Sequence, residues 1–121
     1  MLDSRNTLLK NQISKRRSQR VVARILVRVR KRTDGEDFLS EDSHTLVVNA
    51  HGALIRLAMK VHPSELLAIK NVYRGEEKHS RVIQVREETG SQNEVAIEFT
   101  EPAPRFWHIE FPPADWKLME D

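Results

Sequence analysis

The chain has 121 residues, a formal net charge of +2 and no cysteine. This length suits one domain with one hydrophobic core, and the lack of cysteine excludes disulfides and thiol catalysis and is compatible with a reducing compartment. No apolar run approaches the ~20 residues that a membrane-spanning helix needs, and the first residues contain no apolar signal region. We therefore expect a soluble, cytoplasmic protein.

Charge is distributed unevenly along the chain. Residues 1–32 contain eleven Lys or Arg and one acidic residue, so they carry +10, whereas the remaining 89 residues carry −8. Segregation of this size indicates an anionic partner for the basic part. That partner could be a nucleotide, a nucleic acid, a membrane surface or the acidic remainder of the chain itself.

The N-terminal part consists of an expected arm and a first strand. Residues 1–14 show little periodicity, and we expect them to form a flexible arm in front of a domain that spans residues 15–121. The second part of the basic segment Lys15–Arg32 is a predicted strand, Val21–Val29, in which every odd position is apolar and the even ones include Arg24 and Arg28. This period of two residues predicts one buried and one solvent-facing side. The acidic stretch Thr33–Asp42 contains an Asp-Gly turn signal and is predicted to be a surface loop.

Five more strands are predicted from β-branched residues, alternation and turn signals. They are Ser43–Asn49, Ala53–Val61, Leu66–Tyr73, Arg81–Glu87, with Ile83 and Val85 facing inward, and Glu94–Thr100. Six short strands without a long helical pattern predict an all-β fold, either a barrel or a sandwich. A six-stranded antiparallel barrel is favoured because closure leaves no exposed strand edge. The alternating apolar residues of its strands should share one core.

The C-terminal tail from Pro102 contains both tryptophans. It is predicted to form an extended segment, Phe106–Phe111, followed by a short helix from Pro113 to Leu118. Large aromatic side chains near a terminus usually hold it in place. We expect four of them to close one end of the barrel: Phe106, Trp107, Phe111 and Trp116.

No sequence pattern indicates catalysis, a metal or a cofactor. The chain lacks a glycine-rich phosphate loop, a nucleophile elbow and a His-x-x-x-His pair. The five scattered histidines are interpreted as ordinary surface residues: His44, His51, His62, His79 and His108. We therefore expect a protein that is not an enzyme.

One arrangement nevertheless has a chemical rationale. Arg16 and Arg20 precede the first strand, and the turn from Asn49 to Gly52 can meet them at one rim of a barrel. Guanidinium groups bind phosphate and stack on bases, and an asparagine amide can hydrogen-bond a purine edge. Gly52 would leave the backbone open to a flat ligand. The combination predicts a nucleotide clamp, although Arg-x-x-x-Arg alone is a common pattern.

The same residues resemble the PilZ domain, the bacterial receptor module for cyclic di-GMP, over roughly residues 15–100. That family has Arg-x-x-x-Arg before its first strand, matched here by Arg16–Arg20, and then Asp/Asn-x-Ser-x-x-Gly, aligned here with Val47–Gly52. Val47 stands where the family has Asp or Asn, and Asn49 where it has Ser. The resemblance implies a six-stranded barrel with ligand contacts from Arg16, Arg17, Arg20, Asn49, His51 and Gly52.

Three functions remain open from the sequence. The first is a cyclic di-GMP sensor that passes its signal to an unidentified protein partner. The second is a degenerate PilZ-like adaptor that binds protein and not nucleotide, which Val47 favours because a missing polar contact costs ~1–3 kcal/mol. The third is a small nucleic-acid-binding barrel that uses Lys15–Arg32. Its acidic body and the scarcity of aromatic residues on its strands argue against this third function.

Overall fold

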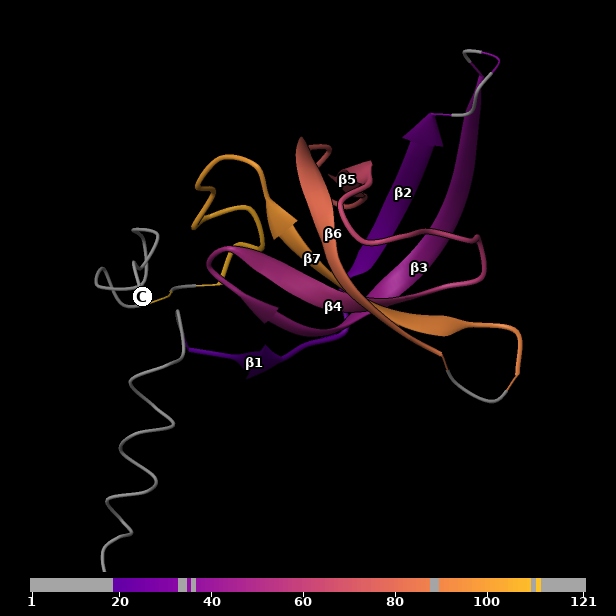
Figure 1. The fold of residues 1–121 in the computed structure, drawn as a ribbon. Helices are drawn as coiled ribbons and strands as arrows, with labels where there is room; N and C mark the ends of the chain where they lie inside the picture. The colour runs from indigo at the N-terminus through magenta and orange to yellow at the C-terminus, as the bar shows by residue number, and fades with distance from the viewer. Residues whose placement is uncertain (1–18, 33–34, 36, 88–89, 110, 112–121) are drawn as a thin grey trace, which may run out of the picture.

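The computed structural model describes residues 19–32, 35, 37–87, 90–109 and 111 (Figure 1). Its strands are β1 (Val21–Val22), β2 (Leu26–Arg32), β3 (Phe38–Asn49), β4 (Gly52–Leu57), β5 (Leu66–Asn71), β6 (Glu77–Glu87) and β7 (Asn93–Phe99). Among these residues no helix has the length and apolar character needed to cross a membrane. The predicted arm 1–14, Arg16, Arg17, the predicted helix from Pro113 to Leu118 and Trp116 lie outside the described residues.

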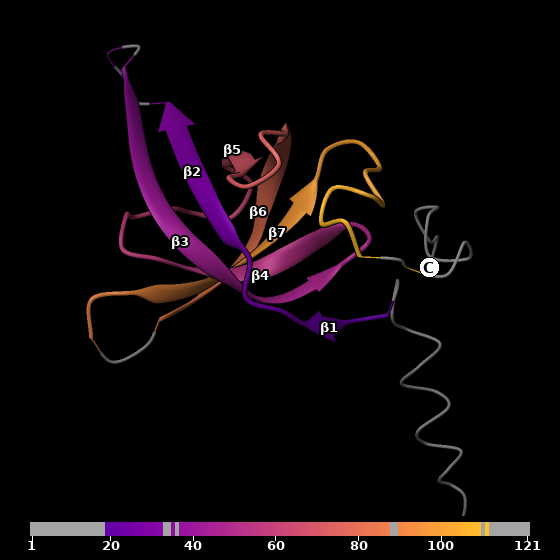
Figure 2. The same cartoon turned by 180° about the vertical axis from the view of Figure 1, so that it is seen from behind.

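Six of the strands close into an antiparallel barrel, which confirms the predicted fold. The order is β3-β2-β5-β6-β7-β4, and β4 pairs back onto β3. The short strand β1 is added to the edge of β3 beyond the end of β2, so that β2 and β1 share one long partner. Figure 2 shows the same arrangement from behind, with β1 at the bottom, beside the end of β3 and far from the arrowhead of β2.

The core contains the apolar residues that the alternation predicted. The buried core residues on β2, β4 and β7 are Val27, Val29, Ala53, Ile55, Leu57, Val95, Ile97 and Phe99. Val61, beyond the end of β4, is also buried, whereas Ile25 and Met59 pack only partly against the cluster. One shared core therefore holds the strands together, because burying apolar surface stabilises a fold by about 25 cal/mol per Å².

The predicted first strand is wrong in one respect: it is two strands, separated at residues 23–25. A buried threonine explains the break, because Thr45 Oγ1 donates to the carbonyl of Ala23 at 2.5 Å and accepts from the amide of Ile25 at 2.9 Å. Next to it β3 has a bulge, since Thr45 pairs with Ile55 but Val47 with Leu54. The side chain satisfies backbone groups that would otherwise lie unpaired where the chain turns from β1 into β2.

Replacing this threonine tests that account. We expect Thr45→Val to lower the free energy of unfolding by about 1–3 kcal/mol, because two partly buried backbone groups lose their partner. The measurement is urea unfolding followed by circular dichroism. Thr100→Val is the matched control, since Thr100 is exposed and makes one bond of 3.3 Å to His79. An equal loss in both variants would contradict the role of Thr45.

The predicted loop Thr33–Asp42 is also partly strand, because β3 begins at Phe38. Cross-strand pairs explain this extension. Arg28 Nε lies 2.7 Å from Asp42 Oδ1, and Arg30 Cζ lies 4.8 Å from the centre of the Phe38 ring. The hydrogen bond from Arg28 lowers the pKa of the Asp42 carboxyl. Asp42, predicted to lie in a loop, is thus a cross-strand partner of Arg28 on β2.

On β6 the predicted inward position of Ile83 is wrong. A bulge lies between Val82, which pairs with Ile97, and Gln84, which pairs with Ala96. Val82 is therefore buried, Ile83 is exposed and Val85 is half-buried. The extra residue leaves Gln84 and Arg86 facing outward, which matters for the site below.

The tail begins with a compact turn where an extended segment was predicted. Phe106 donates its amide to Ala103 at 3.1 Å and His108 to Arg105 at 3.0 Å, and His108 has a φ of 59°. The predicted packing role is confirmed for three of the four aromatic residues, since Phe106, Trp107 and Phe111 are buried. The turn brings two consecutive aromatic rings onto the core, which an extended chain would place on opposite sides.

Candidate functional site

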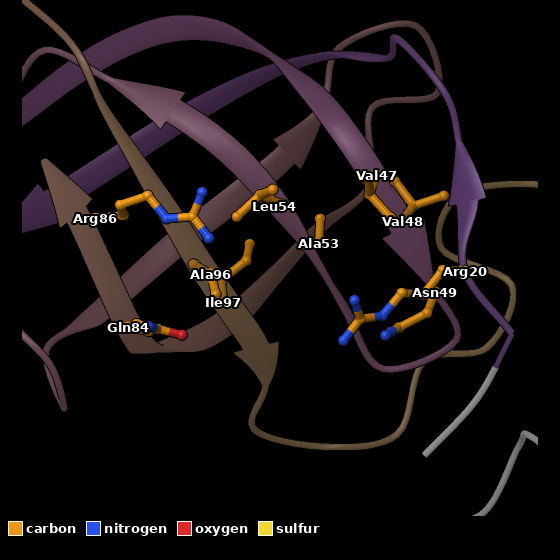
Figure 3. A pocket seen from close by; sticks show the side chains of 10 residues that line it. All are labelled: Arg20, Val47, Val48, Asn49, Ala53, Leu54, Gln84, Arg86, Ala96 and Ile97. Atoms are coloured by element: carbon orange, nitrogen blue, oxygen red, sulfur yellow. The ribbon is translucent and has the colours of Figure 1, made fainter. Parts of the chain in front are cut away.

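A groove of about 260 Å³ lies on the outside of the barrel, over β3, β4, β6 and β7 (Figure 3). Arg20 and Asn49 lie together at one end of it, and Gln84 and Arg86 lie at the other. Between them the half-buried side chains are aliphatic, namely Val47, Leu54 and Ala96, and the buried Ala53 and Ile97 also border the groove. A groove with polar ends and an apolar middle suits a ligand with flat apolar faces and charged or polar groups at its periphery.

The pairing of β1 places Arg20 at the groove. Val21 pairs with Val48, so the residue before it comes beside Asn49. Arg20 is exposed, so its guanidinium can adjust to a ligand. The structure thus brings together two of the predicted site residues that are 29 positions apart in the sequence. The predicted contacts of Arg16 and Arg17 fall outside the described residues.

The bulge in β3 turns Val47 and Asn49 towards the groove. Before the bulge Ser43 and Thr45 are buried, and after it Val48 and Ala50 are buried, so the odd positions change sides. Asn49 Oδ1 accepts the amide of His51 at 2.8 Å. Its Nδ2 is therefore the group left to bond a ligand, and as a donor it matches the acceptors on a purine's outer edge.

Val47 lines the groove but offers no polar atom. It is half-buried between Val22 and Leu54, its partners on β1 and β4. The position where the PilZ pattern has an acceptor is thus at the site and apolar here. A guanine ring at this place would leave its ring donors without the bond that an acidic residue gives.

Gly52 has a structural reason to be glycine. A Cβ there would lie 2.0 Å from the carbonyl oxygen of Ile97 and 3.0 Å from the Cα of Glu98. The backbone of β7 therefore approaches β4 too closely for any side chain at this position. The Gly52 carbonyl accepts a hydrogen bond of 3.1 Å from the indole Nε1 of Trp107. The predicted ligand contact of Gly52 stays a prediction, since the close approach accounts for the residue by itself.

His51 is not the surface histidine that the sequence suggested. It is 3 % exposed, and within the described part of the chain neither ring nitrogen has a hydrogen-bond partner. Leaving such a group unpaired costs about 1–3 kcal/mol. It borders a second hollow of about 220 Å³, which shares Asn49 with the groove. Its role in ligand binding stays a prediction.

The remaining histidines are closer to the surface interpretation. His62, His79 and His108 are exposed and His44 is half-buried. Where the chain is described, no group of three or more His, Asp or Glu residues has the arrangement that a metal ion needs.

Sequence reasoning missed Gln84 and Arg86. Arg86 Nη1 lies 3.5 Å from Glu94 Oε1, and the arginine side chain is 72 % exposed. Both residues were visible as the outward side of a predicted strand, but their position at the groove depends on which strands pair. The register of β6 with β7, and of β7 with β4, carries them next to Leu54.

Part of the basic segment is neutralised by the acidic body. Arg28 pairs with Asp42, and Arg30 Nη2 lies 3.0 Å from Glu77 Oε2. Lys31 Nζ lies 3.4 Å from Glu65 Oε2. Charge on β2 thus has partners inside the domain, which was one of the alternatives for the segregated charge. Arg20 stands apart from these pairs, at the groove.

Comparison with known proteins gives the fold a relative. No family model and no curated protein sequence matches the chain. Among solved structures, the chain is similar to the Bacillus subtilis inhibitor of motility, MotI/DgrA, a PilZ-domain protein, with a TM-score of 0.58 and 16% identity. The match covers 74% of this chain and 44% of that one, so this chain spans less than half of its length. At this identity the similarity shows the fold, which is the PilZ-type barrel that the sequence pattern indicated.

Proposed function

We propose that the chain is a non-catalytic PilZ-type receptor that binds cyclic di-GMP in the groove and transmits this binding to a protein partner. The observation that supports the proposal is the placement of Arg20 beside Asn49 at one end of a groove whose middle is apolar. Guanidinium and phosphate form strong charge-assisted hydrogen bonds, and the amide can donate to a purine edge. The aliphatic middle gives the face of a base a surface to lie on.

The missing acceptor at Val47 sets the expected strength of binding. A site that lacks one such polar contact loses ~1–3 kcal/mol, which is about a tenfold to hundredfold change in affinity. The arginines therefore carry a larger share of the binding free energy here than in a site with Asp or Asn. Arg16 and Arg17, four and three positions before Arg20 in the sequence, are part of the proposed phosphate contact.

A degenerate adaptor is the second candidate, and Val47 is the observation that favours it. An aliphatic residue at the acceptor position cannot accept a hydrogen bond from guanine, and a protein that does not bind the nucleotide has no need of that acceptor. Similarity to an inhibitor of motility does not separate the two candidates, because at 16% identity it shows the fold alone. The nucleic-acid alternative is weaker, because three basic side chains of β2 form ion pairs with Asp42, Glu77 and Glu65.

Calorimetric titration with cyclic di-GMP tests the proposal. We expect the wild type to bind, and Arg20→Ala to weaken binding by at least ~1.5 kcal/mol, or about tenfold, through loss of a charge-assisted hydrogen bond. Val47→Asp should tighten binding, because it restores an acceptor for guanine. Arg74→Ala is the control for charge alone, since Arg74 is exposed and lies in the β5–β6 turn, away from the groove lining.

Each alternative gives a different result. Binding by Val47→Asp but not by the wild type would identify an adaptor that has lost its ligand. Equal losses in the Arg20 and Arg74 variants, with a steep dependence on salt, would indicate a diffuse partner such as nucleic acid. Absence of binding by both the wild type and Val47→Asp would reject the receptor.

A further inference from the structure

We infer that a cyclic dinucleotide spans the groove, with its second half bound by Arg86 and Gln84 of β6. This inference rests on the proposed function and adds a second set of contacts to it. The inference is based on the two similar ends of the groove, each with one guanidinium and one carboxamide, which are separated by aliphatic residues (Figure 3).

The backbone of β6 is built to present both side chains there. The bulge at Ile83 makes Gln84 pair with Ala96 and Arg86 with Glu94. Ala96 in turn pairs with Leu54 of β4, so the aliphatic middle of the groove is continuous with the β6 end. Bulges occur often at barrel rims and beside binding sites, where they redirect side chains.

The chemistry of the two ends matches the two halves of the ligand. A cyclic dinucleotide carries two bases and two phosphates, so its halves present the same groups at opposite sides. Arg86 can bind the second phosphate as Arg20 binds the first. The exposed carboxamide of Gln84 has an acceptor oxygen as well as two donor hydrogens. That oxygen can accept from a guanine donor, the type of bond that Val47 cannot make.

Arg86 is available for a phosphate at small cost. Its ion pair with Glu94 is 3.5 Å long, and the side chains are 72 % exposed for Arg86 and 14 % exposed for Glu94, so the arginine can turn to a ligand while the carboxylate stays largely covered. Arg56 Nη2 lies 3.9 Å from Glu94 Oε2. Glu94 therefore keeps a cationic neighbour when Arg86 moves to the ligand, so no unpaired carboxylate results.

The test is a calorimetric titration of cyclic di-GMP into the wild type and three variants of the whole chain. Arg86→Gln should weaken binding by about tenfold or more, the loss expected for a charge-assisted hydrogen bond. Glu94→Gln should tighten binding, because it removes the carboxylate that competes with phosphate for Arg86. Arg74→Gln, the same substitution outside the groove, should change affinity less than ~2-fold. Thermal unfolding of each variant verifies that it is folded.

The outcomes separate this inference from the proposed function. Binding by the wild type that depends on Arg20 but is unchanged in Arg86→Gln would overturn the second set of contacts and leave the receptor intact. Equal losses in Arg86→Gln and Arg74→Gln would also overturn it, since general electrostatics would then suffice. No binding by the wild type would overturn both. A loss confined to Arg86→Gln, with tighter binding by Glu94→Gln, supports the inference.

Discussion

Gly52→Ala should lower the free energy of unfolding by about 3 kcal/mol, the upper range for inserting atoms into a packed site. The new Cβ would lie 2.0 Å from the Ile97 oxygen and 2.9 Å from its carbonyl carbon. Both atoms belong to the backbone of β7, so no side-chain rotation relieves the contact and the strands must separate. Domains of this size are stable by only about 5–15 kcal/mol, so the loss is readily measured by urea unfolding.

Gly35→Ala is the matched control for this effect. Nothing lies within 4 Å of a Cβ at Gly35, so we expect a change of less than ~0.5 kcal/mol, typical of a surface substitution. A near-neutral Gly52→Ala would show that β4 and β7 are less closely paired than the structure has them. It would also reopen the idea that the glycine is there for a ligand.

The alternation of apolar residues predicted the barrel because each strand has one buried side. In Ala53, Ile55 and Leu57, and again in Val95, Ile97 and Phe99, every predicted inward residue is buried. The pattern fails where a bulge adds a residue. At Leu46 and Ile83 the period of two changes phase, and nothing in the residue types alone marks the change.

Some residues of the candidate site were likewise predictable from the sequence, and others were not. Arg20 and Asn49 were predicted because each belongs to a motif that is local in sequence, although the two motifs are 29 positions apart. Placing Gln84 and Arg86 at the groove required knowledge of the strand order. Strand β6 reaches the groove because it pairs with β7, and β7 pairs with β4. The burial of His51 could not be predicted, because a histidine between Ala50 and Gly52 is typical of a surface turn and its burial depends on tertiary packing.

The turn between β3 and β4 connects the site to the tail. Asn49, at its start, faces the groove, and Gly52, at its end, accepts the hydrogen bond from Trp107. The turn is therefore held on one side by Trp107, which forms an aromatic cluster with Phe99 and Phe106, while the other side is open to a ligand. A rigid support of this kind reduces the conformational entropy that binding would otherwise cost.

Trp107→Ala should lower the free energy of unfolding by about 3–5 kcal/mol, the range for removing a large buried aromatic side chain. Trp107 is 3 % exposed, and its ring centre lies 4.8 Å from that of Phe106 and 5.7 Å from that of Phe99. The substitution empties this cluster and leaves the Gly52 carbonyl without its donor. Urea unfolding measures the loss.

Two further variants separate packing from the hydrogen bond. Trp107→Phe keeps an aromatic ring but removes the indole donor, so we expect a smaller loss of about 1–3 kcal/mol. Tyr73→Ala removes an aromatic ring that is 81% exposed and should change stability by less than ~0.5 kcal/mol. If Trp107→Ala were as mild as Tyr73→Ala, the tail would not be part of the barrel's core, and the support that it gives to the β3–β4 turn would have to come from elsewhere in the chain.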